Sequence, residues 1–204
     1  MPRITLPDGS IKQFGEPVSG ADLAADIGPG LARAAIAIKL NGVVKDLATV
    51  INADAEVSII TNRDDEALEL IRHDVAHVLA EAVQQLFPGT QVTIGPNIEN
   101  GFYYDFAREV PFSTDDLETI EAKMTEIVGR DMPFVRHIWD REEAVQHFEK
   151  KGEFYKAEII RDLPENEEVS IYTQGDWTDL CRGPHMPSTG RIGKAFKLMK
   201  VAGA

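Results

Sequence analysis

The sequence predicts an α+β protein built from two domains. Short strand-like segments separated by turn residues fill the first sixty residues, whereas amphipathic helical stretches dominate the remainder. These helices and strands do not alternate regularly, which argues against a doubly wound fold. The 204 residues, 43% hydrophobic and 27% charged, suffice for one large or two small soluble domains. The polar stretch 61–66 separates a predicted domain 1–62 from a second domain 63–204.

The first domain is predicted to be a small roll of the ubiquitin-like, or β-grasp, kind. Its order is hairpin, helix, hairpin and final strand, and Asn41-Gly42 favours a tight primed turn in the second hairpin. It carries no titratable cluster, so we interpret it as a binding or docking module. The predicted elements are strands 3–6 and 11–14 around Pro-Asp-Gly-Ser, a helix 19–27 ending at Gly28-Pro29-Gly30, strands 35–40 and 43–45, and a strand 56–60.

The second domain opens with the clearest helix, predicted over residues 67–87. Its apolar residues recur at three and four positions and form one stripe that begins at Leu68. A capping-box pattern at Ser113 and Asp116 predicts a helix over 113–128, and Asp140 is expected to cap another. The remaining expectations are strands 91–94, 134–139, 169–173 and 196–201, and a short helix 154–160.

Composition narrows the function classes. A net charge of −13 argues against a general nucleic-acid binder, because such proteins carry basic residues to neutralise phosphates. After Leu180, however, five basic residues and no acidic ones occur, which would admit one short piece of nucleic acid. A single cysteine allows no intrachain disulfide and fits a reducing compartment. Without a signal peptide or membrane-spanning stretch, we expect a cytoplasmic protein with no membrane partner.

Two pairs of residues suggest a chemical site. His73 and His77 are four apart on the long predicted helix, so both imidazoles project from one face, roughly opposite the apolar stripe. Cys181 and His185 are also four apart, but Gly183-Pro184 between them predicts a loop. Three chemistries fit these residues: a zinc site, a Cys–His nucleophile pair, or general acid–base catalysis on a bound water. The residues alone do not select among them.

Three stretches resemble the editing domain of bacterial threonyl-tRNA synthetases: HDVAH at 73–77, GPNIENGFYYDF at 95–106 and DLCRGPHMP at 179–187. The HxxxH and CxxxH pattern is shared with alanyl-tRNA synthetase editing domains, which bind zinc there. Residues 1–60 resemble the TGS domain that precedes the editing domain in threonyl enzymes. The tail FKLMKVAGA resembles the stretch before the family's aminoacylation domain. The resemblance therefore implies the amino-terminal part of a longer threonine–tRNA ligase, without the aminoacylation domain.

The resemblance also implies a function and a set of site residues. The implied activity is hydrolysis of serine wrongly esterified to the 3′ end of threonine tRNA, by an activated water. Its implied partners are that tRNA and the aminoacylation and anticodon-binding domains of the longer chain. The implied catalytic residues are His73, His77, Lys156, Asp179, Cys181 and His185, and Gly95, Tyr104 and Asp179 are implied to bind the amino acid.

Two questions stay open at this point. The four ligands suit zinc, but threonyl editing sites work without it, so we expect no required cofactor. The alternative function is a zinc-binding structural or RNA-docking module without hydrolytic activity. A purely structural zinc site would explain neither Lys156 nor Asp179.

Overall fold

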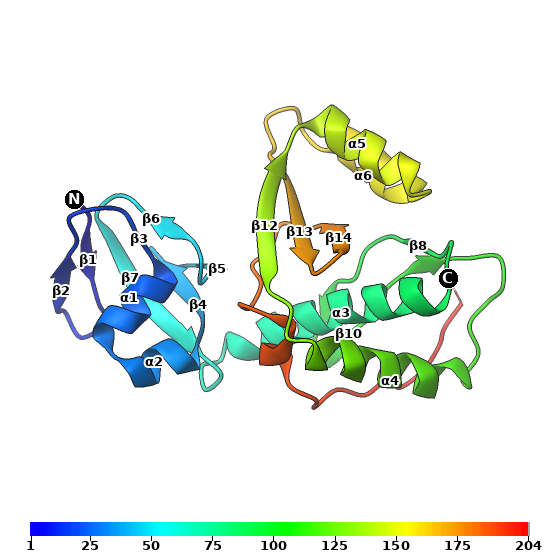
Figure 1. Ribbon diagram of the computed structural model, residues 1–204, viewed down its shortest axis with the longest axis horizontal. Helices are drawn as coiled ribbons and strands as arrows, with labels where there is room; N and C mark the ends of the chain where they lie inside the picture. The colour runs from blue at the N-terminus through cyan, green and yellow to red at the C-terminus, as the bar shows by residue number, and fades with distance from the viewer. Residues whose placement is uncertain (204) are drawn as a thin grey trace. The chain divides into compact units, whose positions relative to one another are not determined.

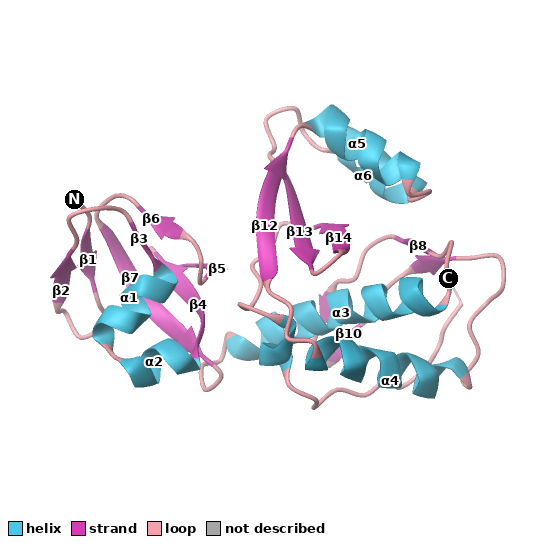
Figure 2. Ribbon diagram, viewed as in Figure 1, coloured by secondary structure: helices cyan, strands magenta, loops and turns pink. Residues whose placement is uncertain are grey.

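The computed structural model describes residues 1–203, so Ala204, the last residue of the predicted second domain, lies outside the described residues. Two compact units are present (Figure 1): Met1–Ile71 with Gly183–Pro187, and Arg72–Arg182 with the residues from Ser188 onward. Figure 2 shows helices and strands in both units, which confirms the α+β class.

The first unit is built on a mixed sheet with strand order β2-β1-β7-β4-β5. The central strand β7 (Ala55–Thr61) runs parallel to β1 and antiparallel to β4. Both predicted hairpins are confirmed, and Asn41 and Gly42 have φ of 48° and 83°, as a primed turn requires. The other strands are β1 (Arg3–Thr5), β2 (Ile11–Gln13), β4 (Ala35–Leu40) and β5 (Val43–Asp46), and β3 (Val18–Ser19) pairs separately with β6 (Val50–Ile51).

Two helices pack on one face of this sheet (Figure 1). Helix α1 (Gly20–Ile27) begins with a capping box formed by Ser19 and Asp22. Its buried Leu23 and Ala24 join Ile4, Ile38 and other sheet residues in the core. Helix α2 (Pro29–Ala34) was not expected, because Gly28-Pro29-Gly30 was interpreted as a stop; proline is tolerated in the first turn, where its missing N–H is not needed. The β-grasp arrangement is confirmed.

The longest helix, α3 (Ala67–Leu86), is confirmed, and Val75, Leu79 and Ala82 of its predicted apolar stripe are buried, but the first member of the stripe is not. Leu68 is 52% exposed, whereas Asp74–Val83 is buried around the whole circumference. Residues on the polar face of this segment therefore lie inside the protein. In the second unit, helix α4 (Asp116–Gly129) runs beside α3 (Figure 1), and the Arg130 side chain after it contacts Glu81 of α3.

The remainder of the second unit is a sheet covered by a helical hairpin. Strands β12 (Phe134–Trp139), β13 (Val169–Gln174) and β14 (Trp177–Leu180) form an antiparallel sheet in that order. Helices α5 (Arg141–Lys150), capped by Asp140 as predicted, and α6 (Phe154–Asp162) lie side by side and pack on β13. The second unit also contains two short strand pairs and one 3₁₀ turn. The pairs are β8 (Gln91–Val92) with β11 (Phe106–Ala107) and β9 (Asn97–Ile98) with β10 (Gly101–Phe102), and the turn is η1 (Thr189–Ile192).

Two predicted elements differ from the structure. Residues 196–201 are not a strand, because side chains of α4 hold this stretch: Leu198 N–H donates to Glu121, and Lys197 pairs with the same carboxylate. Helix α4 starts at Asp116 rather than Ser113, because the carbonyl groups of Ser113 and Thr114 accept hydrogen bonds from residues three positions later and form a turn before the helix. The Asp116 carboxylate still accepts from Ser113, as the predicted capping box requires. Among the described residues, no helix is both long enough and apolar enough to cross a membrane.

The close contact at Gly20 gives a stability prediction. A Cβ at residue 20 would lie 2.5 Å from Ile38 Cγ2 and 2.8 Å from the Leu47 carbonyl oxygen. Gly20→Ala should therefore lower the free energy of unfolding by about 1–3 kcal/mol through overpacking. Gly30→Ala, at a helical position with open space, is the matched control and should not lower stability, because alanine is the better helix former. Urea unfolding of both variants measures the difference, and equal midpoints would contradict the packing argument.

Candidate functional site

A cavity of about 420 Å³ in the second unit collects most of the predicted site residues. It lies among α3, the segment after β8, helix α6 and the end of β14. Of the eight predicted residues, seven line it: His73, His77, Gly95, Tyr104, Lys156, Asp179 and Cys181.

Helix α3 supplies the two imidazoles. His73 and His77 lie one turn apart, with ring centroids separated by 4.9 Å. His77 is only 5% exposed and meets the Trp177 indole edge-on at 5.8 Å. Both imidazoles line the cavity, and Trp177 packs as a structural anchor for the His77 ring.

Strand β14 and the loop after it supply the carboxylate and the thiol. Asp179 lies opposite Tyr172 in the β13–β14 ladder. Beyond the strand, Ser170 and Cys181 continue the pairing: Cys181 N–H donates to the Ser170 carbonyl at 3.1 Å, and Ser170 Oγ donates to the Cys181 carbonyl. This backbone anchoring fixes the thiol, whose Sγ lies 3.1 Å from His73 Nε2.

A buried ion pair joins helix α6 to β14. Lys156 Nζ lies 2.7 Å from Asp179 Oδ1, and the two side chains are only 4% and 1% exposed. On the other carboxylate oxygen, Asp179 accepts from Tyr104 Oη at 3.0 Å, and His77 Nδ1 lies 3.5 Å away. Lys156 Nζ also donates to Tyr104 Oη at 3.3 Å. Asp179 therefore orders three other side chains of the cavity.

Tyr104 acts as a neutral donor in this arrangement. Burial, and next the charge of Asp179, raise the pKa of the Tyr104 hydroxyl well above its usual value, so the phenol keeps its proton. Gly95 permits the ring to lie where it does, because a Cβ at residue 95 would be 2.2 Å from Tyr104 Cδ2. Gly95 and Tyr104 are thus one packing unit on the wall of the cavity.

The eighth predicted residue, His185, is buried, and its backbone N–H donates to Asp46 Oδ1 at 2.7 Å. One potential ligand atom from each of His73, His77, Cys181 and His185 lies within 4.8 Å of the others, so this cluster could hold a metal ion. Three imidazole nitrogens and a thiolate are a donor set that suits tetrahedral zinc.

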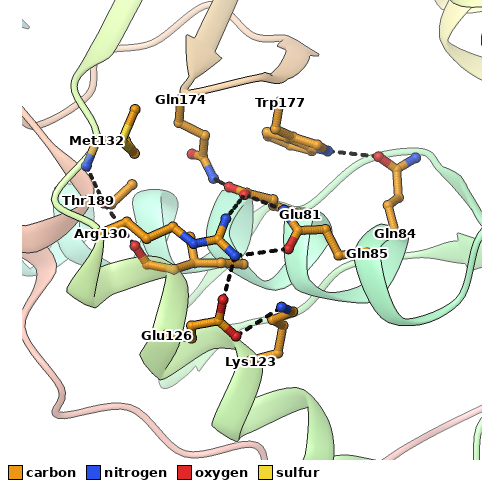
Figure 3. Close-up of polar contacts among 11 residues, drawn as sticks. Glu81, Gln84, Gln85, Lys123, Glu126, Arg130, Met132, Gln174, Trp177 and Thr189 are labelled. Atoms are coloured by element: carbon orange, nitrogen blue, oxygen red, sulfur yellow. Dashed lines mark hydrogen bonds and ion pairs between the residues drawn. The ribbon is translucent and has the colours of Figure 1, made fainter.

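A polar network beneath the cavity was not predicted from the sequence (Figure 3). Buried Glu81, on the helical face that continues from His77, accepts from Gln174 and pairs with Arg130 at 3.3 Å. Trp177 Nε1 donates to Gln84 Oε1 at 2.7 Å. These contacts tie α3 to both ends of the β13–β14 turn. The four-residue spacing from His77 to Glu81 indicates that both lie on one face of α3, but it does not identify Gln174 and Arg130 as the partners of Glu81.

Glu153 is a second residue that the sequence did not reveal. It precedes α6, is 6% exposed, and its Oε2 has no hydrogen-bond partner. Burial, and next the negative charge of Asp179, raise the pKa of the Glu153 carboxyl above its usual value. A poorly solvated carboxyl thus lies close to the Lys156–Asp179 pair.

Comparison with known proteins gives a consistent result for both units. Residues 2–61 match the TGS domain family, and residues 169–203 match the family described as the threonyl and alanyl tRNA synthetase second additional domain. The chain is 64% identical over all 204 residues to the threonine–tRNA ligases of Granulibacter bethesdensis and Rhodospirillum rubrum. It is 62% identical over the same length to that of Acidiphilium cryptum. It spans about a third of the length of these relatives, 32% in each.

The chain therefore combines a TGS domain with a domain of the type found in threonyl and alanyl tRNA synthetases. Over its whole length it corresponds to the amino-terminal region of the threonine–tRNA ligases. This confirms the resemblance drawn from the HDVAH, GPNIENGFYYDF and DLCRGPHMP stretches.

Glu153 gives a pH-dependent stability prediction. Its folded pKa is raised, so the carboxyl is protonated at little cost below the unfolded pKa and destabilises the fold as it ionises at higher pH. Glu153→Gln should therefore stabilise the protein at pH 7 and change stability little at pH 4. Glu118→Gln, at an exposed position on α4, is the control. Thermal unfolding at both pH values measures the effect, and a stabilisation that is equal at both would contradict it.

Proposed function

We propose that the second unit hydrolyses the ester that joins serine to the 3′ end of threonine tRNA. The observation that carries the proposal is that an imidazole, His73, and a buried Lys156–Asp179–Tyr104 arrangement face one small cavity. The kinship with threonine–tRNA ligases supports the choice of substrate. On this proposal, residues 1–62 form the TGS domain and 63–204 the editing domain. The aminoacylation and anticodon-binding domains of a longer chain are proposed partners.

The need for such a reaction follows from the energetics of recognition. A synthetic site that accepts threonine excludes serine only weakly, because a missing methyl group is worth about 1–3 kcal/mol. A second site that admits serine but clashes with the threonine methyl removes the error by hydrolysis. In this proposal the Gly95–Tyr104 wall belongs to that second sieve.

The proposed chemistry begins with a water held by His73 and Lys156. The His73 imidazole accepts a proton from the water while the water oxygen bonds to the ester carbonyl carbon. The Lys156 ammonium stabilises the negative charge that develops on the carbonyl oxygen. The carbon–oxygen bond to the ribose then breaks, and the ribose oxygen takes up the proton.

The remaining residues hold the substrate in this proposal. Asp179, together with backbone groups near Gly95, receives the serine ammonium and hydroxyl. His77, Cys181 and His185 shape the floor and fix the ribose end.

A metal-dependent variant uses the same residues. His73, His77, Cys181 and His185 would be the ligands, and a bound zinc would supply Lewis-acid polarisation or a more acidic water. Our proposal assigns the proton transfer to His73 and the stabilisation of charge to Lys156, and requires no metal.

The 3.1 Å contact between Cys181 Sγ and His73 Nε2 favours one further candidate, a thiol hydrolase with His73 as its base. In that reaction the serine would be transferred to the sulfur before water releases it. We propose instead that Cys181 has no covalent role.

Deacylation assays test the proposed function directly. The chain should release serine from seryl-tRNA(Thr) while leaving threonyl-tRNA(Thr) intact. His73→Ala and Lys156→Ala should each lower the rate by about 10²–10⁴-fold, as expected for loss of a proton-transfer or charge-stabilising group. His137→Ala, on the exposed strand β12, is the control that should leave the rate unchanged.

The same assay separates the alternatives. A chain that releases neither amino acid at high concentration is a structural or RNA-docking module. Loss of activity on chelation, with one zinc per chain by elemental analysis, would establish the metal-dependent variant. A serine thioester trapped on the wild-type protein but not on Cys181→Ala would establish the thiol hydrolase.

Gly95→Ala tests the wall of the cavity. The added Cβ forces the Tyr104 ring away from its position and so loosens its hydrogen bond to Asp179. A displacement of about 1 Å at a site of this kind costs on the order of 10²-fold in rate. Gly129→Ala, where a Cβ meets open space, is the control. Unchanged seryl-tRNA deacylation in Gly95→Ala would remove Gly95 and Tyr104 from the proposed sieve.

A further inference from the structure

The cavity has a buried inner end and an exposed mouth. Lys156 and Asp179 at the inner end are almost completely buried, whereas the Arg182 side chain at the mouth is 76% exposed. Arg182 follows Cys181 directly in the chain, so the mouth begins one residue from the proposed reaction centre. A substrate whose reacting group lies inside has room to extend past Arg182 to the surface.

The mouth carries opposite charges held together by one ion pair. Arg182 Nε donates to Glu167 Oε1 at 2.7 Å, and its terminal nitrogen lies 2.6 Å from the same oxygen. Glu168 also lines the mouth and pairs with Arg136 at 3.5 Å. An ion pair as exposed as that of Arg182 is weak and exchanges readily, because water solvates both partners and the arginine side chain is mobile.

The proposed substrate presents an anion at this place. An ester on the terminal ribose is separated by that ribose from the phosphodiester that links the last two nucleotides. With the ester carbonyl beside His73 and Cys181, the phosphodiester leaves through the mouth. Glu167 and Glu168 would repel it, whereas a guanidinium matches two phosphate oxygens in a bidentate geometry.

We infer that Arg182 binds the last phosphodiester of the tRNA and exchanges its Glu167 partner for the phosphate when substrate enters. This role rests on the proposed function of the cavity and adds a specific binding residue to it. In the free protein, Glu167 neutralises Arg182. In the complex, the released Glu167 carboxylate becomes solvated, and the phosphate takes its place on the guanidinium.

Two substrates that differ only in the phosphate test this role. Seryl-tRNA(Thr) carries the phosphodiester, and adenosine esterified with serine on its ribose does not. Arg182→Ala should raise KM for seryl-tRNA about tenfold with little change in kcat, and leave the hydrolysis of seryl-adenosine within about twofold. It should also reduce the dependence of log(kcat/KM) on log[salt] by about 0.7, the loss of one phosphate contact to a single strand.

Glu167→Gln completes the test. Freed from its partner, Arg182 should bind the phosphate more tightly, so KM for seryl-tRNA should fall. In an Arg182→Ala background the fall should be smaller, because only the repulsion between Glu167 and the phosphate is then removed. Arg161→Ala is the matched control, because Arg161 forms a similarly exposed pair with Glu149 outside the cavity. An equal effect of Arg182→Ala on both substrates, or an unchanged salt dependence, would overturn the role of Arg182.

Failure of the proposed hydrolytic function gives a different result from failure of the Arg182 role. If the wild-type chain hydrolyses neither ester, the function fails, and the role of Arg182 is decided by binding alone. Fluorescence anisotropy with a short RNA ending in CCA then compares wild type, Arg182→Ala and Arg161→Ala. Weaker binding in Arg182→Ala only, with a smaller salt dependence, supports the phosphate contact; equal binding in all three refutes it.

Discussion

The buried ion pair between Lys156 and Asp179 is the contact on which the candidate site depends. Two charges withdrawn from water are tolerated only where each is paired and hydrogen-bonded, and removing one leaves the other uncompensated. Asp179 meets this condition by taking Lys156 on one oxygen and Tyr104 on the other. Because these residues come from β14, α6 and the β10–β11 connection, the pair joins three elements around the cavity. The positions of Lys156, Tyr104 and His77 are therefore coupled to this one carboxylate.

The sequence predicted well those features that local chemistry determines. Asn41-Gly42 defined a hairpin because both residues tolerate positive φ, and Asp140 defined the start of α5 through its side-chain cap. The HxxxH spacing predicted that His73 and His77 project from one face, because residues four apart on a helix are neighbours.

Long-range contacts were beyond the sequence. The partners Tyr104 and Asp179 are 75 residues apart, and Gln174 and Glu81 are 93 apart, so no spacing rule connects them. The stretch 196–201 has a strand-like pattern, yet its backbone is bound by the Glu121 side chain, which only the tertiary structure supplies. The apolar stripe of α3 was an incomplete guide to burial for a related reason. Every residue from Asp74 to Val83 is buried, whatever its polarity, whereas Leu68 at the start of the helix is exposed.

The distribution of charge would reconcile an acidic protein with the RNA substrate that we propose. At physiological salt, charges on the surface act over about 8 Å, so a net charge of −13 does not decide what happens at one mouth. In the inner cavity the charges of Lys156 and Asp179 offset each other, so the local charge there differs from that of the whole chain. At the mouth a single exposed arginine is held by a carboxylate that solvent stabilises equally well when released. On our proposal, such a site would bind the end of a nucleic acid without a basic surface, and affinity for the remainder of the RNA would come from other contacts.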